Sequence, residues 1–174
     1  MKTVTVAILA TMFAVASTSA SAQPAAPNDA QIAGIVVEAN TVDINAGKLA
    51  EKTSHNKEVK AFAKHMVTDH TGVNKQATAL VKKLKVKPED SDTSKSLKDG
   101  GDANITKLKA LKGKDFDKAY VDNEVTYHQA VIDALDKTLI PNAKNAELKD
   151  MLVKVRPAFV AHLDHAKQLQ SSMK

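Results

Sequence analysis

The sequence predicts an all-α protein, an antiparallel four-helix bundle with an extra short or broken helix between the second and third long helices. Three observations support this fold. Four long segments place apolar residues three and four positions apart, which is the spacing of one buried helix face. Polar turns or prolines separate the segments, and the short first and last turns favour antiparallel neighbours. After the first 22 residues, no segment alternates apolar and polar residues as a half-buried strand does.

The four long helices follow one another along the chain. The first is expected over about residues 30–53, and the second continues from the following turn to Leu84. The third is expected over about 115–139 and the fourth over 145–172. Each segment is long enough to span a small domain, so the four together can enclose one apolar core.

Proline residues mark three interruptions. Pro88 lies just after the second helix and ends it, because proline cannot continue a helix without losing a backbone hydrogen bond. The sequence Ile140-Pro141-Asn142 predicts a turn after the third helix. Pro157 lies inside the fourth helix, and we expect it to bend that helix.

The segment between the second and third helices has a weaker helical pattern. Residues 89–96 are polar and turn-like, and Gly100-Gly101 interrupts the apolar spacing that follows. Glycine lowers helix stability because it loses more backbone freedom on folding than other residues. We therefore expect a short or broken helix over 97–113, and the least stable part of the domain.

The N-terminus has the pattern of an export signal. Lys2 precedes an apolar run over 4–15, and Ala20-Ser21-Ala22 fits a small-x-small cleavage site, so the mature chain should begin at Gln23. No later segment is as hydrophobic, and we expect no transmembrane span once the signal is removed. We expect a periplasmic protein. The expected parts are a signal peptide over 1–22, a linker over 23–29 and a four-helix bundle domain over 30–174.

The composition excludes several kinds of site. The chain has no cysteine, which rules out disulfides and thiolate metal ligands. Its formal net charge is +5, but the lysines are scattered among acidic residues and arginine occurs once, at Arg156. Because a nucleic-acid surface needs a clustered basic face, we expect no nucleic-acid partner. An envelope protein that contacts the outer helix faces is a possible partner class.

Two histidines occupy positions where an apolar residue is expected. His128 lies between Val125 and Ile132 on the apolar seam of the third helix, and His162 lies between Phe159 and Ala166 on the fourth. A buried imidazole without a partner costs about 1–3 kcal/mol, so it must meet a hydrogen-bonding group or a metal. The sequence therefore predicts a polar centre inside the bundle.

Every long helix offers a further polar residue on or beside its inner face. Three imidazoles and a carboxylate in one layer would suit Zn, Fe or Cu, since neutral imidazole binds these ions well. A buried hydrogen-bonded network that only stabilises the bundle is the alternative, favoured most at the two candidates that flank the seams, Asp43 and His70. The candidate metal ligands are His70, His128, His162, Asp43 and Asp69, with Tyr120 and Glu124 as supporting polar residues. No catalytic residue and no organic cofactor is predicted.

The spacing of the acidic residues disfavours one class of enzyme. A di-iron carboxylate centre needs Glu-x-x-His on two helices, and this motif does not occur; Glu124 lies four residues before His128. The first hypothesis is a small, non-enzymatic binding or stress-related envelope protein that coordinates a transition metal. The second is a structural or interaction protein in which the cluster only stabilises the bundle. A metal-dependent redox enzyme is the third.

Several motifs together resemble a known bacterial envelope family, the one named domain of unknown function 4142. The motifs cover nearly all of the chain after the signal: Gly47-Lys48-Leu49-Ala50, Val59-Lys60-Ala61-Phe62-Ala63, Met66-Val67-Thr68-Asp69-His70, Phe116-Asp117-Lys118-Ala119-Tyr120, Tyr127-His128-Gln129-Ala130 and Arg156-Pro157-Ala158-Phe159-Val160-Ala161-His162-Leu163. The resemblance implies an exported, ferritin-like four-helix domain without an established activity. It also implies recurrent polar positions at Asp69, His70, Asp117, Tyr120, His128 and His162, and Asp43 where a glutamate is common.

Overall fold

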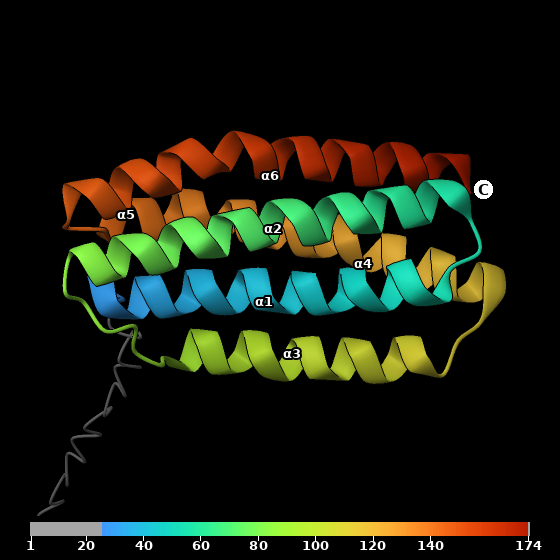
Figure 1. The fold of residues 1–174 in the computed structure, drawn as a ribbon, viewed down its shortest axis with the longest axis horizontal. Helices are drawn as coiled ribbons and strands as arrows, with labels where there is room; N and C mark the ends of the chain where they lie inside the picture. The colour runs from blue at the N-terminus through green and yellow to red at the C-terminus, as the bar shows by residue number, and fades with distance from the viewer. Residues whose placement is uncertain (1–25, 174) are drawn as a thin grey trace, which may run out of the picture.

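The computed structural model describes residues 26–173, and every regular element in that range is helical. Consecutive long helices run in opposite directions (Figure 1). The predicted signal peptide over 1–22 lies outside the described residues, as do residues 23–25 of the predicted linker. The elements are α1 (Asp29–Thr53), α2 (Lys57–Lys83), α3 (Asp92–Lys109), α4 (Gly113–Ala134), the π-helical segment η1 (Leu135–Leu139), α5 (Ile140–Asn142) and α6 (Ala146–Ser172).

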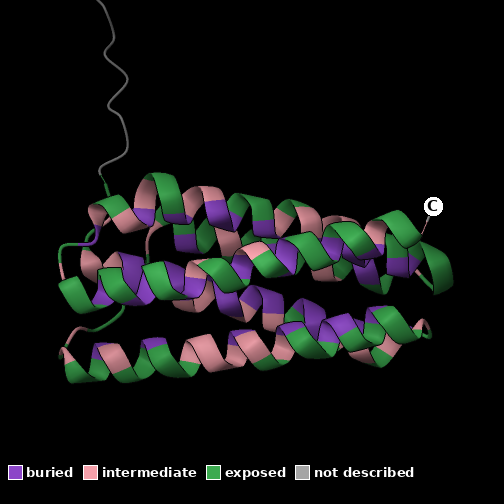
Figure 2. Cartoon of the chain, turned by 90° about the horizontal axis from the view of Figure 1, so that it is seen from above, coloured by how far each residue is buried: buried purple, intermediate pink, exposed green. Residues whose placement is uncertain are grey.

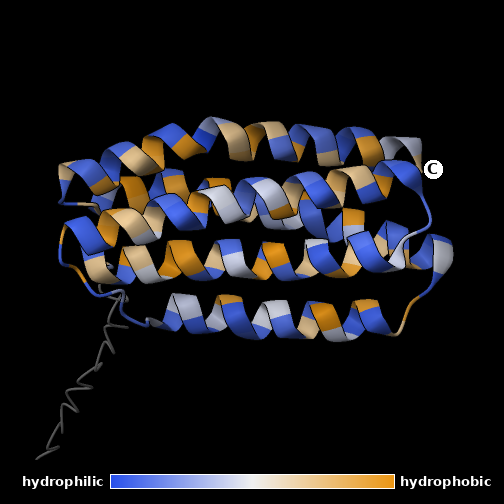
Figure 3. Cartoon of the chain, viewed as in Figure 1, coloured by the Kyte–Doolittle hydropathy of each residue, from blue (hydrophilic) through white to orange (hydrophobic). Residues whose placement is uncertain are grey.

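Helix α1 lies at the centre of the packing. It contacts α2 on one side and α3 on the other, while α4 packs against α6 and α6 against α2. Figure 1 shows α3 as an outer helix beyond α1, away from α2 and α6. Apolar and polar residues alternate around the helices (Figure 3), and buried residues recur along each of them (Figure 2). The prediction of an all-α fold is confirmed.

The core consists of two apolar clusters with a polar layer between them. One cluster joins the first turns of α1 to the end of α4 and the first half of α6, around Ile32, Ile132 and Leu152. The other joins the second half of α1 to the start of α2, the start of α4 and the end of α6, around Phe62 and Tyr120. Buried polar residues of α1, α2, α4 and α6 gather where the two clusters meet: Asn40, Asp43, His70, Glu124, His128 and His162.

Asparagine side chains begin three of the helices. Asn28 accepts a hydrogen bond from the N–H of Gln31 and forms a capping box with it at the start of α1. Asn56 caps α2 and Asn145 caps α6 in the same way, each satisfying free N–H groups of the first turn. Asp29 accepts hydrogen bonds from the N–H groups of Lys144 and Asn145 at 2.8 and 2.9 Å, which ties the start of α1 to that of α6.

The prediction of a short or broken helix after α2 is wrong. Helix α3 is continuous over 18 residues and passes through Gly100-Gly101. A capping box between Ser91 and Ser94 begins it within the segment expected to be a turn. Gly101 is buried against α1, and a Cβ atom there would lie 2.8 Å from both Cγ atoms of Val42. The missing side chain therefore lets α3 approach α1 closely.

The predicted turn at Ile140-Pro141-Asn142 is also wrong, because the chain stays helical through Asn142. The π-helical segment η1 allows the helix to continue through Pro141. Within it the N–H of Ile140 donates to the carbonyl of Leu135, five residues earlier, so the hydrogen-bond register changes before Pro141. Pro141 then lies in the first turn of α5, where its missing N–H is tolerated. The chain turns at Ala143 instead, where the backbone becomes extended.

Pro157 lies inside α6, as the sequence predicts, and the helix continues on both sides of it. A bend at this proline stays a prediction. No helix within residues 26–173 is both long enough and apolar enough to cross a membrane.

The two glycines of α3 allow a matched test of its packing. Gly100→Ala adds a methyl group in open space and should raise the free energy of unfolding by about 0.5–1 kcal/mol, because alanine favours the helix. Gly101→Ala has the same helix preference but overlaps Val42, and should be less stable than Gly100→Ala by about 1–3 kcal/mol. Urea unfolding of both variants measures the difference. Equal stabilities would contradict the close packing of α3 on α1.

Candidate metal centre

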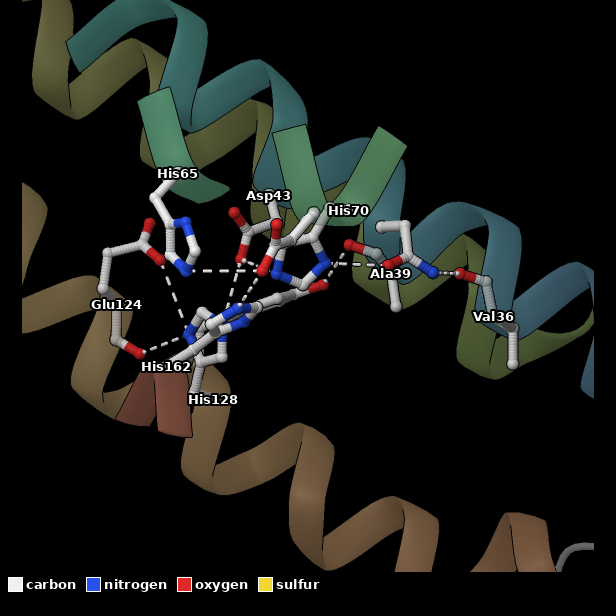
Figure 4. Close-up of polar contacts among 11 residues, drawn as sticks. Val36, Ala39, Asp43, His65, His70, Glu124, His128 and His162 are labelled. Atoms are coloured by element: carbon white, nitrogen blue, oxygen red, sulfur yellow. Dashed lines mark hydrogen bonds and ion pairs between the residues drawn. The ribbon is translucent and has the colours of Figure 1, made fainter. Parts of the chain in front are cut away.

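The polar layer brings three histidine rings together, each from a different helix. His70 comes from α2, His128 from α4 and His162 from α6, and all three are buried. Their ring centroids are 5.5 Å apart for His70 and His128, 5.4 Å for His128 and His162, and 5.2 Å for His70 and His162. Asp43 of α1 is buried beside them (Figure 4). Helices α1, α2, α4 and α6 thus each contribute a polar side chain to this buried layer.

Asn40 holds His70 in one tautomer. The Asn40 Nδ2 atom donates to the Val36 carbonyl at 2.7 Å, so its Oδ1 atom is the one that faces His70. His70 Nδ1 lies 2.7 Å from that oxygen and must donate to it, since an amide oxygen only accepts. The proton of the neutral ring is therefore on Nδ1, and the lone pair is on Nε2.

His128 and His162 are each held through one nitrogen in the same manner. His128 Nδ1 donates to the backbone carbonyl of Glu124 at 3.0 Å, so its Nε2 carries the lone pair. His162 Nε2 donates to Asp69 Oδ2 at 3.0 Å, which leaves the lone pair on Nδ1. The other nitrogens, His70 Nε2, His128 Nε2 and His162 Nδ1, are buried without a hydrogen-bond partner. Each ring is oriented by one nitrogen and free at the other.

Asp43 lies between two of the free nitrogens. Its Oδ2 atom is 3.4 Å from His70 Nε2 and 3.5 Å from His128 Nε2. Both distances exceed the 2.7–3.2 Å of an ordinary N–H···O hydrogen bond. They match the separation of about 3.3–3.5 Å between two ligand atoms bonded at about 2.0–2.2 Å to one tetrahedral ion. A ligand nitrogen from each of the three histidines also lies within 4.8 Å of the other two.

Burial shifts the pKa values of Asp43 and the three histidines toward their uncharged forms. It lowers the pKa of His70 to about 2, helped by the neighbouring histidines, and that of His128 to about 4. It also lowers the pKa of His162, against the opposing effect of Asp69. For carboxyl groups the same cause acts the other way, raising the pKa of Asp43 to about 8. The histidines are therefore uncharged, and Asp43 is largely protonated in the absence of a cation.

Glu124 and Tyr120 extend the polar layer along α4. Glu124 Oε2 is buried without a hydrogen-bond partner, 3.5 Å from His128 Nδ1, and the Tyr120 hydroxyl is also buried and unpaired. Burial, followed by the charge of Asp43, raises the pKa of Glu124 well above its usual value. Oxygen atoms of Asp43 and Glu124 and a nitrogen of His128 lie within 4.8 Å of one another. These groups can accept or release protons beside the three rings.

The inner face of α2 differs from the expected one by one residue. The apolar spacing of the sequence places Asp69 on the seam of this helix and His70 beside it. In the structure His70 is buried with Phe62, Met66 and Ala77, while the Asp69 side chain is 35% exposed. One residue turns a helix by about 100°, which is enough to exchange the two roles. Asp69 therefore holds His162 from outside and does not face the free nitrogens of His70 and His128.

Sequence reasoning missed Asn40, which fixes the His70 tautomer. Asn40 is buried on α1 next to Ala39, three residues before Asp43. It could have been recognised as a polar residue on the inner face that the sequence predicts for this helix. Tyr127 also contributes to this region, because its hydroxyl donates to the Ala39 carbonyl at 2.7 Å. Asp117, which the resemblance implies as a recurrent position, is buried near the start of α4.

A family model described as Domain of unknown function (DUF4142) matches residues 14–169. The chain belongs to this family. No curated protein and no solved structure matches the chain. The DUF4142 description states no activity, so any functional argument must come from the chemistry of the centre itself.

Asp43 should make the stability of the metal-free protein depend on pH. The folded protein keeps this proton up to about pH 8, whereas the unfolded chain releases it near pH 3.8, so unfolding becomes easier as the pH rises between these values. The histidines act oppositely, but only below about pH 6.5, where the unfolded chain takes up protons that the buried rings do not. Between pH 6.5 and 8, therefore, the Asp43 proton still lowers the free energy of unfolding as the pH rises, without the opposing contribution of the histidines.

In chelator, the free energy of unfolding should therefore fall from pH 6.5 to 8 by up to about 1.4 kcal/mol per pH unit for this one proton. Asp43→Asn should remove the part of this decrease in the free energy of unfolding that comes from Asp43. Asp164→Asn, at an exposed position of α6, should leave the decrease unchanged. Urea unfolding at each pH provides the measurement. Identical pH profiles for the parent and Asp43→Asn would show that Asp43 is not held protonated.

Proposed function

We propose that this protein is an exported, ferritin-like four-helix domain that binds one divalent transition-metal ion per chain. The nitrogen ligands are His70 Nε2, His128 Nε2 and His162 Nδ1, and the fourth ligand is an Asp43 carboxylate oxygen. One observation carries the proposal: each ring is held by an acceptor through one nitrogen, its other nitrogen is buried and unpaired, and a ligand nitrogen of each ring lies within 4.8 Å of the other two. Metal-binding histidines are typically oriented in this way, by an acceptor on the nitrogen that does not bind the ion.

Hydrogen bonds among these protein groups alone do not provide a partner for every buried polar atom of the centre. The three free nitrogens are all acceptors, and no protein donor in the described residues lies within ordinary hydrogen-bond distance of them. A buried acceptor without a partner costs about 1–3 kcal/mol. One cation satisfies all three lone pairs at once and takes the place of the Asp43 proton, so the carboxylate charge offsets part of the cation's charge.

The ligand set indicates which ions fit. Three imidazole nitrogens and one carboxylate oxygen, without a thiolate, suit Zn, Fe or Cu. Three histidines and Asp43 fill the four positions of a tetrahedral site, which is the geometry that Zn²⁺ prefers. A filled coordination shell leaves no position for a substrate or reactive water. We therefore infer binding and retention of an ion in the cell envelope rather than catalysis.

The metal content of the protein tests this directly. Mature protein purified without a histidine tag should contain about one ion per chain, or take up one Zn²⁺, Cu²⁺ or Fe²⁺ after treatment with chelator, with a rise in melting temperature. His128→Gln and His162→Gln should each weaken binding by more than about tenfold, and Asn40→Ala by about 10–100-fold through the orientation of His70. His55→Gln, at an exposed turn between α1 and α2, is the matched control and should bind like the parent.

Circular dichroism establishes that each variant remains folded before its affinity is compared. A folded parent protein that holds no ion, and whose melting is indifferent to chelator and to all three metals, would refute metal binding. The polar layer would then serve as a stabilising network between the helices, and function would lie on the outer faces of the bundle.

Export is tested by the N-terminus of the protein in cells. A bacterial host should deliver the chain to the periplasmic fraction with residues 1–22 removed, because the positive start, apolar run and small-residue site fit a cleavable signal. Intact-mass measurement of the fractionated protein should give a chain that begins at Gln23. Protein that keeps Met1 and stays in the cytoplasmic fraction would contradict export.

A further inference from the structure

A second group of potential ligands lies on the outer side of His162. His65 and Asp69 are one turn apart on α2, with His65 Nε2 3.3 Å from Asp69 Oδ2. The same oxygen is 3.0 Å from His162 Nε2, and the rings of His65 and His162 are 5.4 Å apart at 85°. One ligand atom from each of these three residues lies within 4.8 Å of the other two. The group is thus a compact set of two nitrogens and one oxygen.

This outer group connects solvent to the buried centre. The side chain of His65 is 53% exposed and that of Asp69 35%, whereas His162 is 5% exposed and His70 and His128 are at 1% and 0%. His162 belongs to both groups. Its Nε2 faces Asp69, and its other nitrogen is the buried, unpaired one. Figure 4 shows His65 and His162 in the same close-up as Asp43, His70 and His128.

We propose that His65, Asp69 and His162 Nε2 form an outer cation site through which a divalent transition-metal ion enters and leaves the buried centre. The inference rests on the function proposed above, because it describes how that centre is loaded. Transferring a divalent ion from water to a site with nearly inaccessible ligands in one step is costly, since all its hydration is lost before new bonds replace it. The outer ligands replace part of that hydration while the ion still faces solvent, and the Asp69 carboxylate offsets part of its charge.

His162 can pass the ion inward because its two nitrogens lie on opposite edges of one ring. With the ion at Nε2, the proton of the neutral ring is on Nδ1. As the ion moves to Nδ1, the proton of that nitrogen is released to water, and Nε2 takes one proton from water on the solvent-exposed side and donates it to Asp69. The ring loses one proton and gains one, so its charge does not change, and the proton of Asp43 is released to water when its carboxylate binds the ion. The ion then meets the free nitrogens of His70 and His128 and the carboxylate of Asp43.

The rates at which the protein binds and releases the ion test whether His65 and Asp69 form an outer cation site or only a surface ion pair. Metal-free mature protein is mixed with Co²⁺, whose visible absorption reports the ligand environment, and release is followed after addition of chelator. His65→Gln should slow both association and release by about tenfold, the usual loss for an outer ligand, and change the Kd less than twofold. The reason is that a residue which binds only the ion in transit alters both rates equally. His55→Gln, outside the group, should leave both rates unchanged.

Asp69→Asn should also slow loading, and it should in addition raise the Kd because its amide holds His162 differently from the carboxylate. His65→Gln protein that binds Co²⁺ with parental Kd and parental rates would overturn the outer site and leave the buried centre intact. A higher Kd with an unchanged association rate would overturn it as well. Folded parent protein that fails to bind Co²⁺, Zn²⁺, Cu²⁺ or Fe²⁺ would instead refute the buried centre, and the outer site with it.

Discussion

The structure of the polar layer depends on hydrogen-bond partners for three buried imidazole rings, those of His70, His128 and His162. Each ring takes the place of an apolar side chain between two hydrophobic clusters, and each is held by a fixed acceptor: the Asn40 amide, the Glu124 carbonyl or the Asp69 carboxylate. Because a neutral ring has one proton, these three bonds determine where its lone pair lies. The side-chain chemistry of the centre therefore depends on acceptors that never contact an ion.

The helix packing keeps those acceptors in place. α1 carries both Asn40 and Asp43, and it is held by α2 on one side and by α3 on the other. The contact of Gly101 with Val42 lies one residue from Asp43, so the outer helix supports the segment that carries the carboxylate. At one end of the bundle, the π-helical segment and the Asp29 bonds to the start of α6 join the remaining helices. The polar layer is thus enclosed by rigid elements rather than by loops.

Much of the fold could be predicted from the pattern of side chains, and the errors have definite causes. The apolar spacing identified the long helices, and Asn28 and Asp29 are both residue types that cap helices, of which Asn28 is the one that accepts the N–H of Gln31. The break at Gly100-Gly101 was predicted from helix preference alone, which takes no account of a close neighbour such as Val42. Pro141 was expected to end a helix, but a wider hydrogen-bonded turn before it removed the conflict. In both places tertiary or local geometry outweighed intrinsic preference.

Helical periodicity alone was enough to predict that His128 and His162 lie inside the bundle, because an apolar face repeats every 3.6 residues and both positions belong to it. The same periodicity does not define the buried face of a helix to within one residue. For that reason Asp69 was predicted to face inward, whereas the structure buries its neighbour His70. Three features follow from the packing of the helices alone: which nitrogen of each ring is free, the orientation of His70 by Asn40, and the distances of 3.4 and 3.5 Å from Asp43 Oδ2 to two of the free nitrogens. Such distances join residues on different helices, and they depend on how the helices rotate and shift against one another, which the periodicity of each helix does not record.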